Sequence, residues 1–368
     1  MRANVLTDPA FTKQAGQFAR LSLDFDKPEN AAFLEKFKTE GVPVFYVIDP
    51  VTEKAALSWY GTATAPQLLK LLADGRRALA GGGEGAGAAL AAADRLNGEN
   101  QYAEAAKAYQ RALEAGGPDW PERSRTIESL VMAQSFAHEA AAAVATALEY
   151  APSMPRDRSF VNTVYFGLDN AQPGSPELRK IEDLAEEAVK IPGVLADDTA
   201  QLYLELANAY RYSDKNETAA KRAAEAALAY VQEQIRRTAT PESRTSMDSF
   251  LVSAAFLLGK PEIAIPELER SQRDFPADYN PPARLAAVYD RLGRNQEAIT
   301  EIDRAIGLAY GARKANLYAQ KASRLAAHGD KDAARRTLEQ ASEFAKTLPP
   351  SQASGVQQRI GKQLAQLK

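Results

Sequence analysis

Few side chains in this sequence could carry out catalysis. The 368 residues contain no cysteine and two histidines, His138 and His328. The missing thiols exclude cysteine nucleophiles, disulfide bonds and thiolate metal sites within the chain as given. His138-Glu139 begins a zinc-binding His-Glu-x-x-His pattern, but Ala142 stands where the second histidine must lie one turn later. Both histidines are therefore expected to be structural, and neither a metal nor a cofactor is predicted.

Two other patterns could bind a charged ligand. Asp24 and Asp26 lie at the end of an expected strand and could hold a cation. Because few other carboxylates lie near them in the sequence, the favoured interpretation is that both are solvated charges at the strand end. The glycine-rich run at 80–87 could cradle a phosphate, but no strand leads into it and no Lys-Ser or Lys-Thr follows. Residues 76–87 are therefore predicted to be a flexible linker.

Charge and hydropathy exclude two classes of partner. The net charge is −3 and the pI is about 5.7, which argues against binding to nucleic acid or to an anionic membrane. No apolar run is long enough to span a bilayer, and the N-terminus has no apolar signal core. The chain as written is predicted to be cytoplasmic, and periplasmic if the true start lies upstream.

The elements that would position functional side chains are clearest in residues 279–312. Apolar residues recur there every three or four positions on both sides of Gly293. Gly293 suits the left-handed conformation that ends a helix. The stretch predicts two short amphipathic helices around a turn. The apolar positions are Leu285, Ala286, Tyr289, Ala298, Ile302, Ala305 and Ile306.

The residue types and offsets of this stretch resemble the tetratricopeptide repeat, with Pro282 in the place of the family's tryptophan. Turn glycines recur at Gly259, Gly293 and Gly329, and an alanine follows each of them five residues later. A register that is kept over successive units predicts stacked helical pairs that bury one continuous core. The three alanines are Ala264, Ala298 and Ala334.

The predicted fold is multidomain, with a small α/β domain over residues 1–75 followed by an all-α superhelix of tetratricopeptide type. About seven helical pairs are expected over residues 88–348. The pair at 197–234 has an apparent one-residue insertion in its turn. Residues 349–368 are expected to form a capping helix that shields the last repeat.

The resemblance implies that the first helix of each pair lines a groove that binds a polypeptide. Small polar residues at those places suit hydrogen bonding to an extended peptide, and the alternative is that they are simply solvated. The family's carboxylate clamp is not reproduced, because only Asn208 and Arg284 fall in comparable places and they lie two repeats apart. The predicted groove residues are Gln201, Asn208, Arg211, Ser249, Ser253, Asn280, Asp290, Asn316 and Ser323.

The N-terminal domain resembles the C-terminal three-quarters of a thioredoxin-like domain. The phrases LDFDKPENAAFLEKFKTEGVPVFYVIDP and YGTATAPQLLKLL carry the resemblance. It implies that Pro43 follows a cis peptide bond and that the backbone of Val42 pairs with an extended substrate. The expected elements are a strand at 18–25, a helix at 30–39, a strand at 44–49, its hairpin partner at 55–60 and a closing helix at 65–73.

The family's Cys-x-x-Cys and the strand before it are missing. Either the chain starts late, at an internal methionine, or the redox strand was lost and the remainder kept as a scaffold. The late start is favoured, because unpaired inner strand edges would cost about 1–3 kcal/mol for each buried backbone group. The predicted function is a scaffold that binds a polypeptide partner and carries a redox-inactive thioredoxin-like module. The alternative is a thiol-disulfide oxidoreductase or redox chaperone whose Cys-x-x-Cys lies upstream.

Overall fold

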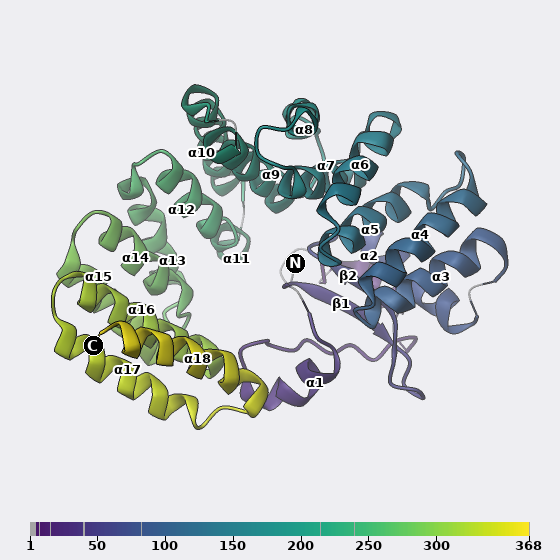
Figure 1. The fold of residues 1–368 in the computed structure, drawn as a ribbon. Helices are drawn as coiled ribbons and strands as arrows, with labels where there is room; N and C mark the ends of the chain where they lie inside the picture. Colours follow the sequence, from purple (N-terminus) through teal and green to yellow (C-terminus); the bar gives the residue numbers. More distant parts are fainter. Residues whose placement is uncertain are drawn as a thin grey trace. The chain divides into compact units, whose positions relative to one another are not determined.

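The chain forms two compact units. The computed structural model describes residues 5–6, 8–14, 16–39, 41–81, 83–213, 215–238 and 240–367. Unit 1 comprises Met1–Phe18 and Phe37–Arg237, and unit 2 comprises Ala19–Lys36 and Thr238–Lys368. Helical pairs stack in both units (Figure 1), so the predicted repeat array is present. No helix in the described ranges is long and apolar enough to cross a membrane.

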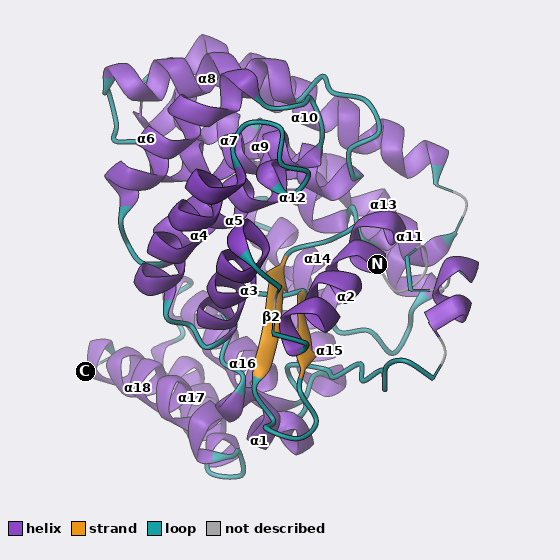
Figure 2. Cartoon of the chain, turned by 90° about the vertical axis from the view of Figure 1, so that its right-hand side faces the viewer, coloured by secondary structure: helices purple, strands orange, loops and turns teal. Residues whose placement is uncertain are grey.

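A β-hairpin lies near the start of unit 1. β1 (Val44–Ile48) and β2 (Ala55–Tyr60) pair in antiparallel register, with Val44 opposite Tyr60. β1 consists of β-branched and aromatic residues, and β2 ends with Trp59 and Tyr60; such residues favour strands. Figure 2 shows the hairpin with helices beside it, and β2 contacts both α2 and α3.

Helix α2 (Ala65–Leu79) covers the hairpin. It begins at a capping box. The backbone N–H of Gln67 donates to Oγ1 of Thr64, and the backbone N–H of Thr64 donates to Oε1 of Gln67. The helix approaches β1 so closely that a Cβ on Gly75 would lie 2.7 Å from Cβ of Val47. The core between them contains Val5, Phe11, Val47, Leu57, Trp59, Leu68 and Leu71.

Helix α2 also runs past the predicted start of the flexible linker. Asp74 and Ala78 in its last turns are buried, and burial of these turns against the neighbouring elements favours continued helix over a mobile tether. Only residues 80–84 remain between α2 and α3.

The strand predicted at residues 18–25 is not formed. The segment has no regular structure, and β1 and β2 are the only strands in the part of the chain that the structure describes. The prediction rested on alternating Leu21, Leu23 and Phe25, which are 77%, 40% and 47% exposed. With no neighbouring strand, this alternation buries no apolar face. The thioredoxin-like part of the predicted fold class is therefore not confirmed.

The repeats of unit 1 form a continuous stack. The first helices of successive pairs, α5, α7 and α9, contact one another, and each contacts its own second helix. Alanines with almost no exposed surface, such as Ala105 and Ala147, allow the close approach. The helices are α3 (Gly85–Gly98), α4 (Tyr102–Gly116), α5 (Arg123–Phe136), α6 (Ala140–Tyr150), α7 (Arg158–Asn170), α8 (Pro176–Ala188), α9 (Ala196–Asn208) and α10 (Glu217–Arg237).

Unit 2 confirms the predicted register. Gly259, Gly293 and Gly329 have φ angles of +66°, +70° and +88°, and the alanines five residues later are almost fully buried. The helices are α1 (Ala31–Lys36), α11 (Pro241–Thr245), α12 (Asp248–Leu257), α13 (Ile265–Asp274), α14 (Asn280–Arg291), α15 (Asn295–Leu308), α16 (Gly311–Ala327), α17 (Lys331–Ala345) and α18 (Pro350–Gln366).

Helix α18 packs against the last helical pair of unit 2. Val356 and Ile360 are 6% and 2% exposed and join the core formed by α16 and α17. Short helix α1 also contacts α18, and Figure 1 shows the two side by side. The capping helix therefore has neighbours from both parts of unit 2.

The contact at Gly167 of α7 gives a first test of the packing. A Cβ there would lie 2.8 Å from Cβ of Ala147 and 3.0 Å from Cδ1 of Ile181. We expect Gly167→Ala to lower the free energy of unfolding by about 1–2 kcal/mol, because overpacking outweighs the helix propensity of about 1 kcal/mol that alanine adds. Gly307 lies in the last turn of α15, and nothing lies within 4 Å of an added Cβ there, so Gly307→Ala should stabilise instead. Urea titration followed by circular dichroism distinguishes these results, and stabilisation by both variants would contradict the close contact.

Candidate functional site

Two predicted groove residues, Gln201 and Asn208, lie on α9 beside α7. Burial raises the pKa of the Tyr165 hydroxyl to about 12, against a smaller opposing effect of the Gln201 side chain. Burial, and then the charge of Asp169, raise the pKa of Glu205, while the Asn208 side chain lowers it. These residues of α7 and α9 form an acidic, hydrogen-bonding cluster.

Arg211, the third predicted residue of this region, lies in a π-helical turn, Ala209–Ser213. This turn follows α9 directly, where the sequence predicts the one-residue insertion, and π-helical turns accommodate such insertions. The Nε of Arg211 is 3.2 Å from Oε2 of Glu217 at the start of α10. The guanidinium is thus engaged in an ion pair within its own repeat.

The predicted groove residues of α12 and α14 have different environments. Ser249 and Ser253 are exposed on α12. Asn280 donates its backbone N–H and its side-chain Nδ2 to Oδ1 of Asp278, each at 2.8 Å. The serines are thus accessible to a ligand, whereas the Asn280 amide is held by its neighbour.

The predicted residues nearer the C-terminus already have partners in the repeats. Asp290 Oδ2 is 3.5 Å from Nε of Arg324 on α16. Asn316 accepts a hydrogen bond of 2.6 Å from Arg359, and Ser323 accepts one of 3.0 Å from Gln363. Arg359 and Gln363 belong to α18, so the capping helix uses two of the positions that the sequence assigns to a ligand.

Val42 and Pro43 lie immediately before β1. Their peptide bond is cis, as the resemblance implies. The Pro43 carbonyl accepts a hydrogen bond of 2.8 Å from the N–H of Gly61, and the Val42 side chain is 66% exposed. Pairing of Val42 with a substrate stays a prediction.

A polar site of unit 2 holds Asp24 and Asp26. The Tyr310 hydroxyl donates to Oδ2 of Asp24 at 2.5 Å, and the Tyr279 hydroxyl donates to Oδ2 of Asp26 at 2.7 Å. Nε of Arg313 lies 3.7 Å from the same Asp26 oxygen. The two carboxylates, expected to be solvated or to bind a cation, are therefore bound by side chains of the repeats.

The tyrosines occupy equivalent places in the fold. Tyr279 directly precedes α14 and Tyr310 directly precedes α16, the first helices of consecutive pairs. Their ring centroids are 6.0 Å apart, with planes at 89°. This edge-to-face contact fixes the rings so that both hydroxyls face the acidic segment. We name Tyr279, Tyr310, Gly311 and Arg313 the tyrosine site.

Electrostatics of the tyrosine site follow from these contacts. Burial, and then the hydrogen bond to Asp26, raise the pKa of Tyr279 to about 12. The hydrogen bond to Asp24 is the main reason that the pKa of Tyr310 is raised. Both hydroxyls are therefore protonated donors at neutral pH, which is the state needed to bind carboxylates.

The acidic segment is shaped by its own hydrogen bonds. Asp24 Oδ1 accepts from the N–H of Asp26 at 3.0 Å, and the Asp24 carbonyl accepts from Asn30 Nδ2 at 2.8 Å. Oδ2 of Asp24 remains directed to Tyr310. No local pattern in the sequence indicates these tyrosine contacts, because the bonded residues are 253 and 286 positions apart.

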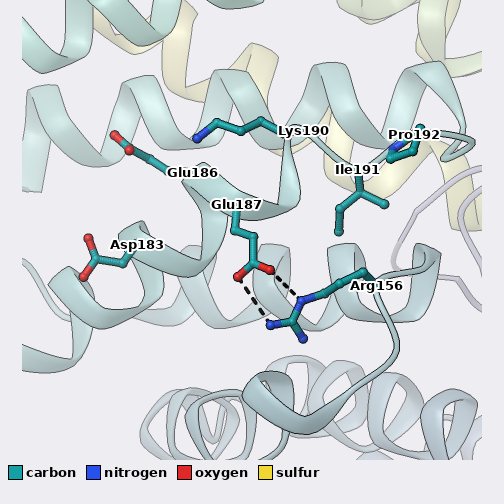
Figure 3. A pocket seen from close by; sticks show the side chains of 7 residues that line it. All are labelled: Arg156, Asp183, Glu186, Glu187, Lys190, Ile191 and Pro192. Carbon is teal, nitrogen blue, oxygen red and sulfur yellow. Dashed lines mark hydrogen bonds and ion pairs between the residues drawn. The ribbon is translucent and has the colours of Figure 1, made fainter.

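A separate open pocket of about 460 Å³ lies beside α8 in unit 1. Figure 3 shows Arg156 directed at Glu187, and its Nε donates to Oε1 of Glu187 at 2.6 Å. The same guanidinium donates to the Met154 carbonyl at 2.8 Å. Within the described ranges, no three His, Asp or Glu side chains are grouped so that they could hold a metal. The pocket is lined by Arg156, Asp183, Glu186, Glu187, Lys190, Ile191 and Pro192.

Comparison with known proteins finds solved structures that have low similarity to this chain. No protein-family model and no curated protein matches this chain. A tetratricopeptide repeat protein from Parabacteroides merdae aligns over 74% of this chain and 97% of its own, with 12% identity and a TM-score of 0.47. The TPR2AB domain of yeast Sti1, in complex with pHSP90, aligns over 77% and 98%, with 17% identity and a TM-score of 0.30. The assignment of a helical-repeat fold therefore rests on the helical pairs themselves.

Proposed function

We propose that this protein is an interaction scaffold that binds an extended polypeptide along the first helices of its repeats. One observation carries the proposal: in unit 2 the helical repeats already hold a segment without regular structure, through Asp24 and Asp26. Exposed Ser249 and Ser253 on α12 add hydrogen-bonding groups on another first helix of the same unit. Hydroxyl groups and charged side chains of this kind can bind a peptide, and peptide binding needs no catalytic group.

The hairpin and α2 have the strand-strand-helix order that ends a thioredoxin-like domain. We propose that this part is a structural module of the scaffold. Arg125 on α5 pairs with Asp74 of α2, and Asn97 on α3 donates a hydrogen bond of 2.8 Å to Ser58 of β2. These buried contacts support a module that is fixed to the first repeats, and the sequence provides no thiol for redox chemistry.

Photo-crosslinking in the full chain tests the scaffold proposal. A photoreactive amino acid at Ser253, exposed on first helix α12, is expected to crosslink to a bound polypeptide in the native host. The same amino acid at Arg270, exposed on second helix α13, is the matched control and should not crosslink. Mass spectrometry of the products identifies the captured peptide. Equal labelling at both positions, or none at Ser253, would contradict binding along the first helices.

A further inference from the structure

We propose that the tyrosine site is a docking site for an acidic Asp-x-Asp segment of a partner polypeptide, and that Asp24–Asp26 of this chain occupies it in competition with the partner. The inference rests on the proposed scaffold function and names the partner chemistry of one site.

The first argument is the match between donors and acceptors. Two tyrosine hydroxyls and one guanidinium meet two carboxylates that are separated by one residue. Hydrogen bonds to charged acceptors are stronger and more selective than bonds between neutral groups. Neutral Asn-x-Asn would lose this charge assistance and the ion pair with Arg313, so the site discriminates acidic segments from amide ones.

The second argument concerns the backbone of the bound segment. Gly311 has a φ of +55°, and a Cβ on it would lie 1.7 Å from the carbonyl oxygen of Asp26. No other described glycine of unit 2 meets backbone atoms at such a distance. The missing side chain therefore admits the main chain of an acidic segment, whichever residues flank the two aspartates.

The third argument is that the segment of this chain is held in a way that allows exchange. Leu21, Leu23 and Phe25 are exposed, so little apolar surface is buried around the two carboxylates. Arg313 is half-exposed and its contact with Asp26 is long, which makes this ion pair weak. A partner with the same two carboxylates and additional apolar contacts would displace the segment.

The other charged groups near the site are consistent with an acidic ligand. Arg284 is close enough to Tyr279 and Arg313 to interact with them, and its own pairing is a 4.0 Å contact with Asp248. Asp278 also faces Arg284 and partly offsets its charge. Asp248 and Asp278 thus offset the charge of Arg284, while Arg313 is the cation in contact with Asp26.

Fluorescence anisotropy with a labelled peptide tests the proposal in the full chain. The probe is RLSLDFDKPEN, the sequence of residues 20–30. Asp24→Asn/Asp26→Asn should free the site, and this variant is expected to bind the probe about tenfold to a hundredfold more tightly than the unchanged chain. Adding Tyr279→Phe/Tyr310→Phe should abolish the gain, and a probe with asparagine at both aspartates should not bind. Equal weak binding by the unchanged and freed chains would overturn the proposal.

Hydrogen exchange in glycine variants provides an independent readout. Gly311→Ala should increase exchange in residues 19–36, because the new Cβ clashes with the Asp26 carbonyl. Gly293→Ala is the matched control, since Gly293 also has a positive φ of +70° but has nothing within 4 Å of the added Cβ. Unchanged exchange in Gly311→Ala would overturn the docked arrangement. Crosslinking at Ser253 without binding of the acidic probe would refute this inference and leave the scaffold proposal standing, whereas failure of both would refute both.

Discussion

Replacing Arg125 with methionine is expected to lower the free energy of unfolding of unit 1 by about 3–5 kcal/mol. Nη2 of Arg125 lies 2.9 Å from Oδ2 of Asp94, and its Nε lies 3.6 Å from Oδ2 of Asp74. The three side chains are 9% exposed or less. Methionine fills a similar space but leaves buried Asp94 without its cation and buried Asp74 with only the half-exposed Arg77, and this desolvation penalty dominates the cost.

The network also explains the direction of two pKa shifts. Burial raises the pKa of Asp74, and the charge of Arg125 is the largest effect that opposes it. Burial is the largest single effect on the pKa of Arg125 and lowers it, but Asp94, Tyr109 and Asp74 together outweigh burial and raise the pKa. Without the guanidinium, the carboxylates must either stay charged in a buried place or take up protons at neutral pH, and both outcomes destabilise the folded state.

Tryptophan fluorescence in urea measures this effect cleanly. Trp59 and Trp120, the two tryptophans of the chain, both belong to unit 1. Arg77→Met is the matched control, because Arg77 pairs with the same Asp74 but is 50% exposed, and its loss should cost less than about 1 kcal/mol. Adding Asp74→Asn and Asp94→Asn to Arg125→Met should recover part of the stability. Similar losses for Arg125→Met and Arg77→Met would show that the buried network is not what holds α2 to the repeats.

The helical array was predictable from the sequence because its signals are local and repeated. Gly259, Gly293 and Gly329 end helices in the left-handed conformation, which glycine adopts at little steric cost. The alanines at fixed offsets are buried where helices of a pair meet. The pattern recurs every 34 to 36 residues, and each repeat packs against the repeats before and after it in the sequence, so the stacking can be predicted from the sequence alone.

The tyrosine site could not be predicted in the same way. The alternation of Leu21, Leu23 and Phe25 favours a strand. A strand forms only where another strand pairs with it, and the local sequence does not show whether such a partner is present. The actual partners of Asp24 and Asp26 follow more than 250 residues later. The burial of Arg125 could not be predicted either. A charged residue on a helix is expected to be exposed to solvent unless its neighbours in space are known.

Replacing Asp248 with asparagine is expected to stabilise unit 2 by about 2–3 kcal/mol at pH 7.5 and to have little effect at pH 4. Asp248 is fully buried at the start of α12. Its ion pair with Arg284 is 4.0 Å long, and the Ser271 side chain and Arg284 only partly oppose the effect of its burial. Burial raises its pKa to about 6, whereas an unfolded aspartate has a pKa of about 3.9.

The sign of the pH dependence follows from this difference. The folded state retains the Asp248 proton up to about pH 6, so the group contributes stability below about pH 4 that is lost as the pH rises through about 6. Asparagine stays neutral at every pH and removes that loss. The helix N-terminus favours the charged carboxylate by only about 0.3–1 kcal/mol, which is less than the cost of burial.

Hydrogen exchange followed by mass spectrometry is the measurement, because the tryptophans do not report on unit 2. Protection of α12 and α14 gives the free energy of opening at each pH. Asp303→Asn is the matched control in the same unit, since Asp303 is 50% exposed and pairs with Lys321, and its effect should stay within about 1 kcal/mol. Lower protection of Asp248→Asn at pH 7.5 would contradict the prediction. It would mean that the pairing of the carboxylate with Arg284 stabilises the folded state by more than its burial costs. Equal gains at pH 7.5 and pH 4 would instead attribute the stabilisation to packing of the amide rather than to the buried charge.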